Sequence, residues 1–255
     1  MTLLALTREI SPAIVHCELT HLERVPIDLA RARAEHEAYE DALRALGCRV
    51  ERLASDATMP DSVFIEDTAI VLDELAVITR PGAPSRRAET EAVAAALRPF
   101  RELASIAAPG TLDGGDVVRL GRRLLVGVGA RSNEEGVRQL RALVAAAGYT
   151  VEAVRFRDCL HLKSAVTSLA DDVVLLNPKW IDLEELGRVR GIEIDAGEPY
   201  AANALRVGDD IVFPAEFERT RGLIEGAGFS VRTVPAGELA KAEGAVTCCS
   251  LMLEG

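Results

Sequence analysis

The feature that most constrains the fold of this 255-residue chain is a pattern that recurs every ~40 to 50 residues. Each unit contains an apolar strand, a turn, a second strand, an amphipathic helix and an outer strand. The second unit is a clear example, with strands at 67–72 and 76–79 across an acidic turn, a helix at about 88–97 and a strand at 103–106. Five such ββαβ units predict an α/β fold in which the units form a closed, propeller-like ring.

The other units repeat this order along the chain. Their expected strands and helices lie at 3–6, 14–16, 28–46 and 49–53; at 116–120, 124–128, 134–147 and 150–156; at 164–169, 173–176, 183–189 and 191–195; and at 203–207, 211–213, 216–227 and 230–234. A closing strand at 246–253 has no second strand after it, so we expect the N-terminal strands to complete its unit. Periodicity alone leaves an open mixed sheet with helices on its faces as the alternative. We find no low-complexity linker, and we expect one catalytic domain over 1–255.

Composition and charge exclude several classes of function. The formal charge of −11 argues against a nucleic-acid partner, because phosphates bind to basic surfaces. We expect no membrane partner, since no apolar run reaches the ~18 residues that a bilayer span needs. The five cysteines are odd in number and widely spaced, and no signal-like N-terminus precedes them, so we expect reduced thiols in a cytoplasmic protein. The sequence leaves open whether the chain is a monomer or a homodimer.

Two residues at unit junctions form a candidate nucleophile and base. Cys248 and Cys249 open the closing strand, where a free cysteine is ordinarily a small buried hydrophobic residue. His161 lies between the outer strand of the third unit and the first strand of the fourth, at the position equivalent to the one just ahead of Cys248. This equivalence favours Cys248 as a nucleophile and His161 as its partner, with Cys249 a buried thiol on the opposite side of the strand.

Acidic residues occupy two further junctions. Asp113 precedes two glycines, which allow close approach of the backbone and can direct its carboxylate inward toward His161. In the junction 60–67, an extended backbone would place Asp61 and Asp67 on one face and Glu66 on the other. Carboxylates at the same radial position as a cysteine and a histidine indicate a pocket for a cation.

Two arginines complete the candidate site. Arg86 follows a proline- and glycine-containing loop, and Arg131 occupies the equivalent place in the next unit. An arginine can bind a carboxylate through two parallel hydrogen bonds. Acids for a cation, arginines for a carboxylate and a Cys/His pair match the needs of an arginine-like amino acid that is attacked at its guanidinium carbon.

Five sequence words carry a resemblance to a known family. They are PDSVFIED at 60–67, ITRPGAPSRR at 78–87, TLDGGD at 111–116, LHLKS at 160–164 and TCCS at 247–250. In this order, over most of the chain, the words resemble those of the dimethylarginine dimethylaminohydrolases of the pentein superfamily. The resemblance implies the pentein fold, an α/β-propeller with pseudo-five-fold symmetry.

The resemblance also implies a role for each site residue. Cys248 matches the nucleophile, His161 the general acid and base, and Asp113 the residue that orients the histidine, where many bacterial relatives have the longer Glu. The other matching positions are implied to bind substrate: Asp61, Glu66 and Asp67 as acids, Arg86 and Arg131 at the carboxylate, Leu19 in a mobile lid, and Ala242 through its carbonyl at the amine.

The activity implied is hydrolysis of asymmetric dimethylarginine or monomethylarginine to citrulline and an alkylamine, through a covalent thiouronium on Cys248. The resemblance implies neither a metal nor an organic cofactor. Two alternatives stay open at this point. One is an arginine deiminase or another guanidino-modifying enzyme of the same fold, and the other is a non-catalytic protein that binds a cationic amino acid.

Overall fold

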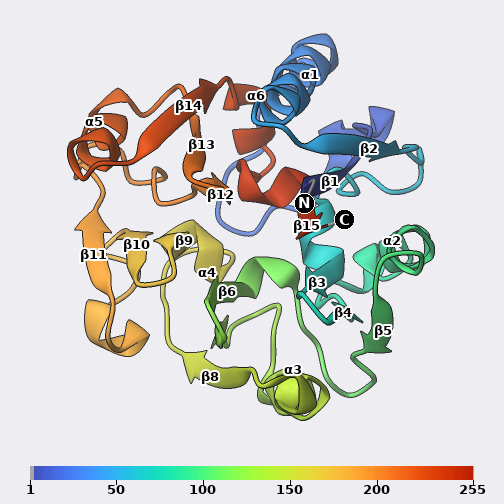
Figure 1. The fold of residues 1–255 in the computed structure, drawn as a ribbon. Helices are drawn as coiled ribbons and strands as arrows, with labels where there is room; N and C mark the ends of the chain where they lie inside the picture. The colour runs from blue at the N-terminus through green and yellow to red at the C-terminus, as the bar shows by residue number, and fades with distance from the viewer. Residues whose placement is uncertain (1–2, 255) are drawn as a thin grey trace.

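The computed structural model describes residues 3–254; residues 1, 2 and 255 of the predicted domain lie outside this range. Five three-stranded sheets surround a common centre (Figure 1). In each sheet the inner strand is antiparallel to the middle strand, which is parallel to the outer one. In the order inner, middle, outer, the sheets are β15 (Leu251–Glu254), β1 (Leu3–Arg8), β2 (Arg49–Leu53); β3 (Ala69–Val71), β4 (Leu75–Ile78), β5 (Glu102–Ser105); β6 (Val117–Leu120), β7 (Arg123–Gly127), β8 (Thr150–Val154); β9 (Val166–Ala170), β10 (Val173–Leu176), β11 (Arg190–Glu193); and β12 (Leu205–Val207), β13 (Asp210–Pro214), β14 (Ser230–Val234).

A helical segment connects each middle strand to its outer strand, as the repeat predicts. Figure 1 shows the longer ones at the periphery. These segments are α1 (Leu29–Ala45), α2 (Glu89–Leu97), α3 (Glu134–Val144), the 3₁₀ helix η6 (Leu183–Leu186) and α5 (Glu218–Gly226). Local sequence sets their ends: the Asp28 carboxylate accepts the N–H groups of residues 30 and 31 at the start of α1, and Gly47 follows that helix with a φ of 87°. The helix predicted at 183–189 is wrong in type and length, because only one 3₁₀ turn forms there.

The two ends of the described chain close the ring. β15 pairs antiparallel with β1 in the register Leu6 to Leu251, and β1 pairs in parallel with β2. Figure 1 accordingly shows β1 and β15 together near the centre. The N-terminal strands therefore complete the last unit, and five separate sheets replace the open mixed sheet that periodicity had left as an alternative.

Three segments predicted as extended are 3₁₀ helices instead. The segment predicted as a strand at 14–16 belongs to η1 (Pro12–His16), which begins with a proline and is capped by the side chain of Ser11. The junction expected to be extended contains η2 (Ile65–Thr68). The closing strand begins only at Leu251, because η7 (Thr247–Cys249) precedes it. Apolar patterning marks these segments as buried, and it does not distinguish a buried strand from a buried helical turn.

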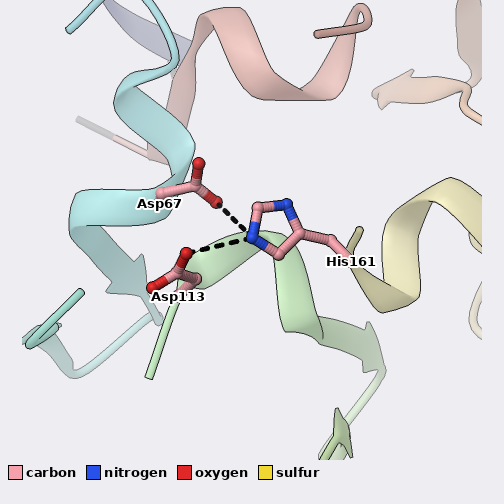
Figure 2. A group of neighbouring side chains, drawn as sticks. All are labelled: Asp67, Asp113 and His161. Carbon is pink, nitrogen blue, oxygen red and sulfur yellow. Dashed lines mark hydrogen bonds and ion pairs between the residues drawn. The ribbon is translucent and has the colours of Figure 1, made fainter. Parts of the chain in front are cut away.

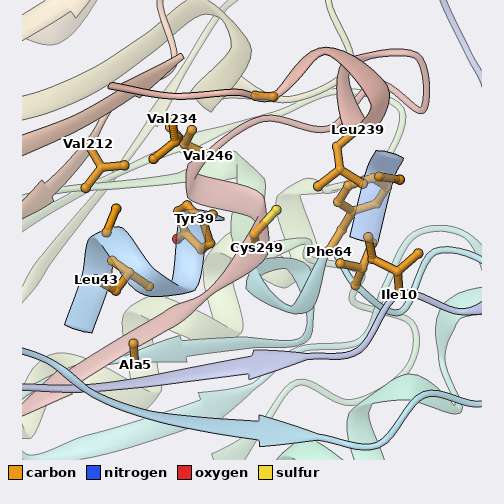
Figure 3. Close-up of a cluster of buried hydrophobic side chains, with 14 of the residues drawn as sticks. Ala5, Ile10, Tyr39, Leu43, Phe64, Val212, Val234, Leu239, Val246 and Cys249 are labelled. Atoms are coloured by element: carbon orange, nitrogen blue, oxygen red, sulfur yellow. The ribbon is translucent and has the colours of Figure 1, made fainter. Parts of the chain in front are cut away.

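The hydrophobic core is divided among the interfaces between neighbouring units. One cluster joins α1 to the neighbouring sheet of β12, β13 and β14, and Figure 3 shows Tyr39, Leu43, Val246 and Cys249 converging there. Cys249 is buried in this cluster, whereas Cys248 is only half-buried at its edge. The expectation of a buried, structural Cys249 therefore agrees with its surroundings, although it lies on a 3₁₀ turn rather than on a strand.

Candidate active site

A short helical turn precedes four of the five inner strands, and the candidate catalytic residues lie in these turns or directly before them. η2 leads into β3, η4 (Gly114–Asp116) into β6, α4 (Leu162–Ala165) into β9, and η7 lies just ahead of β15. η2 contacts both η4 and η7, and α4 contacts η4. The repeat thus brings residues that are far apart in sequence to one end of the central axis.

One ring nitrogen of His161 faces two carboxylates from other units, those of Asp67 and Asp113 (Figure 2). Its Nε2 atom is 3.0 Å from Asp113 Oδ2 and 3.9 Å from Asp67 Oδ1. Gly115 makes this approach possible, because a Cβ atom there would lie only 2.8 Å from His161 Nδ1. The amide of Gly115 also donates a hydrogen bond of 2.9 Å to Asp67 Oδ1, which fixes that carboxylate beside the ring.

These carboxylates control the charge of the imidazole. Burial disfavours the charged form of His161, but Asp67, the hydrogen bond to Asp113 and the nearby Asp116 outweigh burial and raise its pKa to about 9. Asp67 responds in the opposite direction: burial would raise its pKa, yet His161 and Arg86 hold it at about 2. At neutral pH the pair is therefore an imidazolium beside a carboxylate.

Asp113 is held in place by both of its carboxylate oxygens. Oδ1 accepts a hydrogen bond of 2.8 Å from the amide of Gly82, while Oδ2 faces His161. Its own amide donates to the Ser132 hydroxyl, and the residue is fully buried. The shorter aspartate side chain consequently reaches the histidine in this structure.

Asp116 holds the backbone next to this histidine, a role that sequence reasoning missed. Its carboxylate accepts the amide of Leu162 at 3.0 Å and the hydroxyl of Ser132 at 2.6 Å. Burial raises the pKa of Asp116 to about 6. Its place in the TLDGGD word was the only available signal, because the contact that gives it a role is between units.

Seven of the predicted site residues line one cleft, and Cys248 and His161 are both among them. The seven are Asp61, Asp67, Arg86, Arg131, His161, Ala242 and Cys248. Burial raises the pKa of the Cys248 thiol to about 12, and the negative charges of Glu66 and Asp67 act in the same direction. Without a cation in the cleft, Cys248 is therefore a thiol and not a thiolate.

Glu66 points away from this cleft. Its carboxylate binds Lys163 Nζ at 2.5 Å and accepts the hydroxyl of Thr247 at 2.8 Å. The separation of Glu66 from Asp61 and Asp67 agrees with the expectation, but a 3₁₀ turn produces it rather than an extended strand. Lys163 belongs to the LHLKS word, but it was not identified from sequence because its ion pair spans 97 residues.

The two arginines have different surroundings. Arg86 is buried and donates to Asp67 Oδ2 at 2.5 Å, to Glu89 Oε2 at 2.8 Å and to a backbone carbonyl at 3.0 Å. Arg131 makes one long contact within residues 3–254, of 3.4 Å between Nη2 and Thr20 Oγ1. Arg131 is thus the arginine with hydrogen-bonding capacity to spare for a ligand.

The segment around Leu19 is anchored over the cleft at two points. The Glu18 amide donates to both oxygens of Asp61 at 3.2 Å. The amides of Thr20, His21 and Leu22 donate to the carboxylate of Glu243 at 2.5–3.1 Å. Leu19 lies between these anchors and packs on the cluster of Figure 3. Glu243, missed from sequence, therefore ties this segment to the turn before Cys248.

Among residues 3–254, one cluster of side chains could hold a metal ion. Asp67, Asp113 and His161 each offer a ligand atom, and these atoms lie within 4.8 Å of one another. All three groups already bond to protein partners, since Arg86 occupies Asp67 and Gly82 occupies Asp113. Ion binding at this cluster would compete with the proton on His161 Nε2.

Comparisons with known proteins connect this geometry to a family. A model described as arginine deiminase matches residues 55–198. N(G),N(G)-dimethylarginine dimethylaminohydrolase from Pseudomonas aeruginosa is 37% identical over 88% of this chain and 89% of its own length. The enzyme of that name from Streptomyces coelicolor is 39% identical over 98% of this chain and 96% of its own length.

A solved structure of the Pseudomonas aeruginosa protein supports the same relation. This structure is a cysteine-to-serine mutant complexed with citrulline. It superposes with a TM-score of 0.95 at 34% identity, and covers 99% of this chain and 100% of the other. The match extends over the whole ring, so the five-unit fold expected from the sequence is confirmed.

Proposed function

Because this chain belongs to the dimethylarginine dimethylaminohydrolase family, we propose that it hydrolyses N-ω-methylated arginine to citrulline and an alkylamine. The observation that carries the proposal is the convergence of Cys248 and His161 on one cleft that also holds acids and an available arginine. The substrate is asymmetric dimethylarginine or monomethylarginine. Among residues 3–254, no helix combines the length and apolar character that a bilayer span requires.

Substrate binding follows from the charges of the cleft. Asp61 and Asp67 bind and align the guanidinium, while Arg131, with Arg86 beside it, binds the carboxylate. The carbonyl of Ala242 accepts from the substrate amine, and Leu19 covers the bound molecule. Glu66 acts on the substrate site indirectly: paired with Lys163, it holds Thr247, the residue before Cys248, through a hydrogen bond.

The first chemical step begins when the guanidinium lowers the pKa of Cys248. The thiol loses its proton to solvent, and the thiolate attacks the guanidinium carbon. The imidazolium of His161 then donates its proton to the departing nitrogen, the C–N bond breaks and dimethylamine or methylamine leaves. An S-alkylthiouronium remains on Cys248, and His161 is now neutral.

The second step reverses the role of His161. The neutral imidazole removes a proton from water as the oxygen attacks the same carbon, and the C–S bond breaks to return the thiolate. Citrulline results after loss of a proton from the remaining nitrogen. Asp113 and Asp67 favour the imidazolium that forms, and Asp113 holds the ring in one orientation.

The decisive experiment separates this activity from its closest rival. Purified protein is incubated with asymmetric dimethylarginine and, separately, with arginine, and citrulline, dimethylamine and ammonia are measured. We expect citrulline and dimethylamine in equal amounts. Citrulline and ammonia from arginine alone would instead identify an arginine deiminase, the activity after which the matching family model is named. Binding without citrulline or a covalent adduct would identify a binding protein.

The proposal includes the setting of the enzyme. We place it in the cytoplasm, because all five cysteines are free thiols and Cys248 must stay reduced to react. We also propose that residues 1–255 form a single catalytic domain. A monomer and a homodimer are both compatible with a site built from residues of one chain. The charge of −11 supports a small cationic substrate over nucleic acid.

A further inference from the structure

A second cavity opens on the other side of His161 and Cys248. It shares Leu160, His161, Glu243 and Cys248 with the catalytic cleft, so the two spaces meet at the reacting groups. It contains neither Arg86 nor Arg131. We call it the side cavity; its apolar and aromatic walls are formed by Leu22, Leu160, Trp180, Tyr200, Phe217 and Ala236.

Aromatic rings from the fourth and fifth units surround this space. The rings of Trp180 and Tyr200 have centroids 5.4 Å apart, and Tyr200 is 55% exposed, which marks the mouth of the cavity. Phe217 is braced by the edge of Phe213 at a centroid distance of 6.3 Å. Rigid aromatic walls that end in solvent form a site for an apolar group.

Three of the polar groups on the walls already have partners. Glu66 binds Lys163, Asn203 binds the hydroxyl of Thr247 at 2.9 Å, and Glu216 accepts the amide of Ala236 at 3.0 Å. A charged ligand at these three groups would have to compete with the existing bonds. An alkyl chain, in contrast, would gain from burial against the rings without disturbing a hydrogen bond.

We propose that the side cavity binds the N-ω substituent of the substrate and accepts alkyl groups longer than methyl. This inference rests on the proposed function, which requires the leaving nitrogen to lie beside His161 to receive its proton. The carboxylate end of the substrate extends toward Arg131, so the substituents on the leaving nitrogen extend the other way, past His161 into the side cavity. The substrate class thereby includes arginines with propyl-sized N-ω groups.

The kinetic test compares N-ω-propylarginine with N-ω-methylarginine. We expect the propyl compound to be hydrolysed with a lower KM, by roughly four-fold for each additional methylene that is buried. Phe217→Ala should reduce the propyl-to-methyl ratio of kcat/KM by about ten-fold, because it removes one wall. Phe229→Ala is the matched control: Phe229 packs in the same hydrophobic cluster as Phe217 but does not line the cavity, so the ratio should stay the same.

Three outcomes would overturn the inference. They are hydrolysis of methylarginine but not of propylarginine, a propyl-to-methyl ratio that Phe217→Ala leaves unchanged, and a ratio that both phenylalanine variants lower equally. The last would mean that the loss follows from packing rather than from the cavity. Thermal unfolding of both variants shows whether each is folded at the assay temperature.

A binding experiment separates failure of this inference from failure of the proposed function. Methyl-, propyl- and pentylguanidine are titrated calorimetrically into the Cys248→Ser variant, which cannot react. Affinity that rises with chain length, and falls in Cys248→Ser/Phe217→Ala, supports the cavity even if methylarginine is not hydrolysed. Affinity independent of chain length overturns it, even if methylarginine is a substrate.

Discussion

The Nε2 atom of His161 lies 3.0 Å from Asp113 Oδ2, although the two residues are 48 positions apart and belong to different units of the ring. Asp67, from a third unit, approaches the same nitrogen at 3.9 Å. One imidazole nitrogen therefore faces two carboxylates, and this raises the pKa of His161 to about 9 despite its burial. Because a raised histidine pKa favours the charged form, the general acid is present at neutral pH and is lost as pH rises through 9.

Asp113→Asn tests this relationship. Removing one negative charge should lower the His161 pKa, so the alkaline limb of the kcat profile should move to lower pH. The lost orientation should reduce kcat by ~10²-fold. The control is Asp73→Asn, which changes an exposed acid paired with Arg119 and should leave the profile as it is. An alkaline limb that stays in place in Asp113→Asn would contradict the assignment.

The adjacent cysteines should behave differently when each is replaced by serine. Cys248→Ser should abolish citrulline formation while substrate still binds, because the hydroxyl is a far weaker nucleophile. Cys249→Ser should stay active but lose ~1–3 kcal/mol of unfolding free energy, since it places a hydroxyl in an apolar cluster. Activity assays, calorimetric binding and urea unfolding measure these effects. An active Cys248→Ser beside an inactive Cys249→Ser would move the nucleophile by one position.

Replacing Arg86 should mainly lower the stability of the protein, whereas replacing Arg131 should mainly weaken substrate binding. Arg131→Ala should raise KM ten-fold or more, because the substrate carboxylate loses its partner. The fold should stay intact, because this guanidinium makes a single long contact within residues 3–254. Arg86→Ala should destabilise the protein by ~3–5 kcal/mol, since it leaves the buried Asp67 and Glu89 carboxylates without their cation. KM values and urea unfolding curves provide the comparison. An unchanged KM in Arg131→Ala would remove it from the substrate site.

Glu243 should control the segment that covers the cleft. Its carboxylate accepts three consecutive backbone amides, of residues 20–22. In Glu243→Gln the amide group can accept at only one atom, so we expect faster hydrogen exchange in residues 18–22 and a higher KM. Glu225→Gln, an exposed helical residue paired with Arg221, is the control. Exchange that stays as slow as in the unchanged protein would show that other contacts hold the segment.

The sequence predicted the ring well because its signals are local. Apolar strands, acidic turns and glycines after helices recur in each unit, and a repeat unit cannot bury its apolar surface without neighbours. The closure of the ring by the two ends of the chain was predicted from the unpaired last strand alone. Besides the helix predicted at 183–189, the errors fall at Ile14, Asp67 and Cys248, where 3₁₀ turns replace expected strands. Short apolar segments have the same sequence pattern in both conformations.

The sequence alone determined the order of the units, the junctions that carry reactive side chains and the family words. Only the tertiary structure decided which partner each side chain has, since most of these contacts join residues that are far apart in the sequence. It placed Arg86 between Asp67 and Glu89, joined Glu66 to Lys163, and set two carboxylates against His161. The physical reason is that charge and hydrogen bonding act over a few ångströms in space, whereas sequence patterns report only on neighbours along the chain.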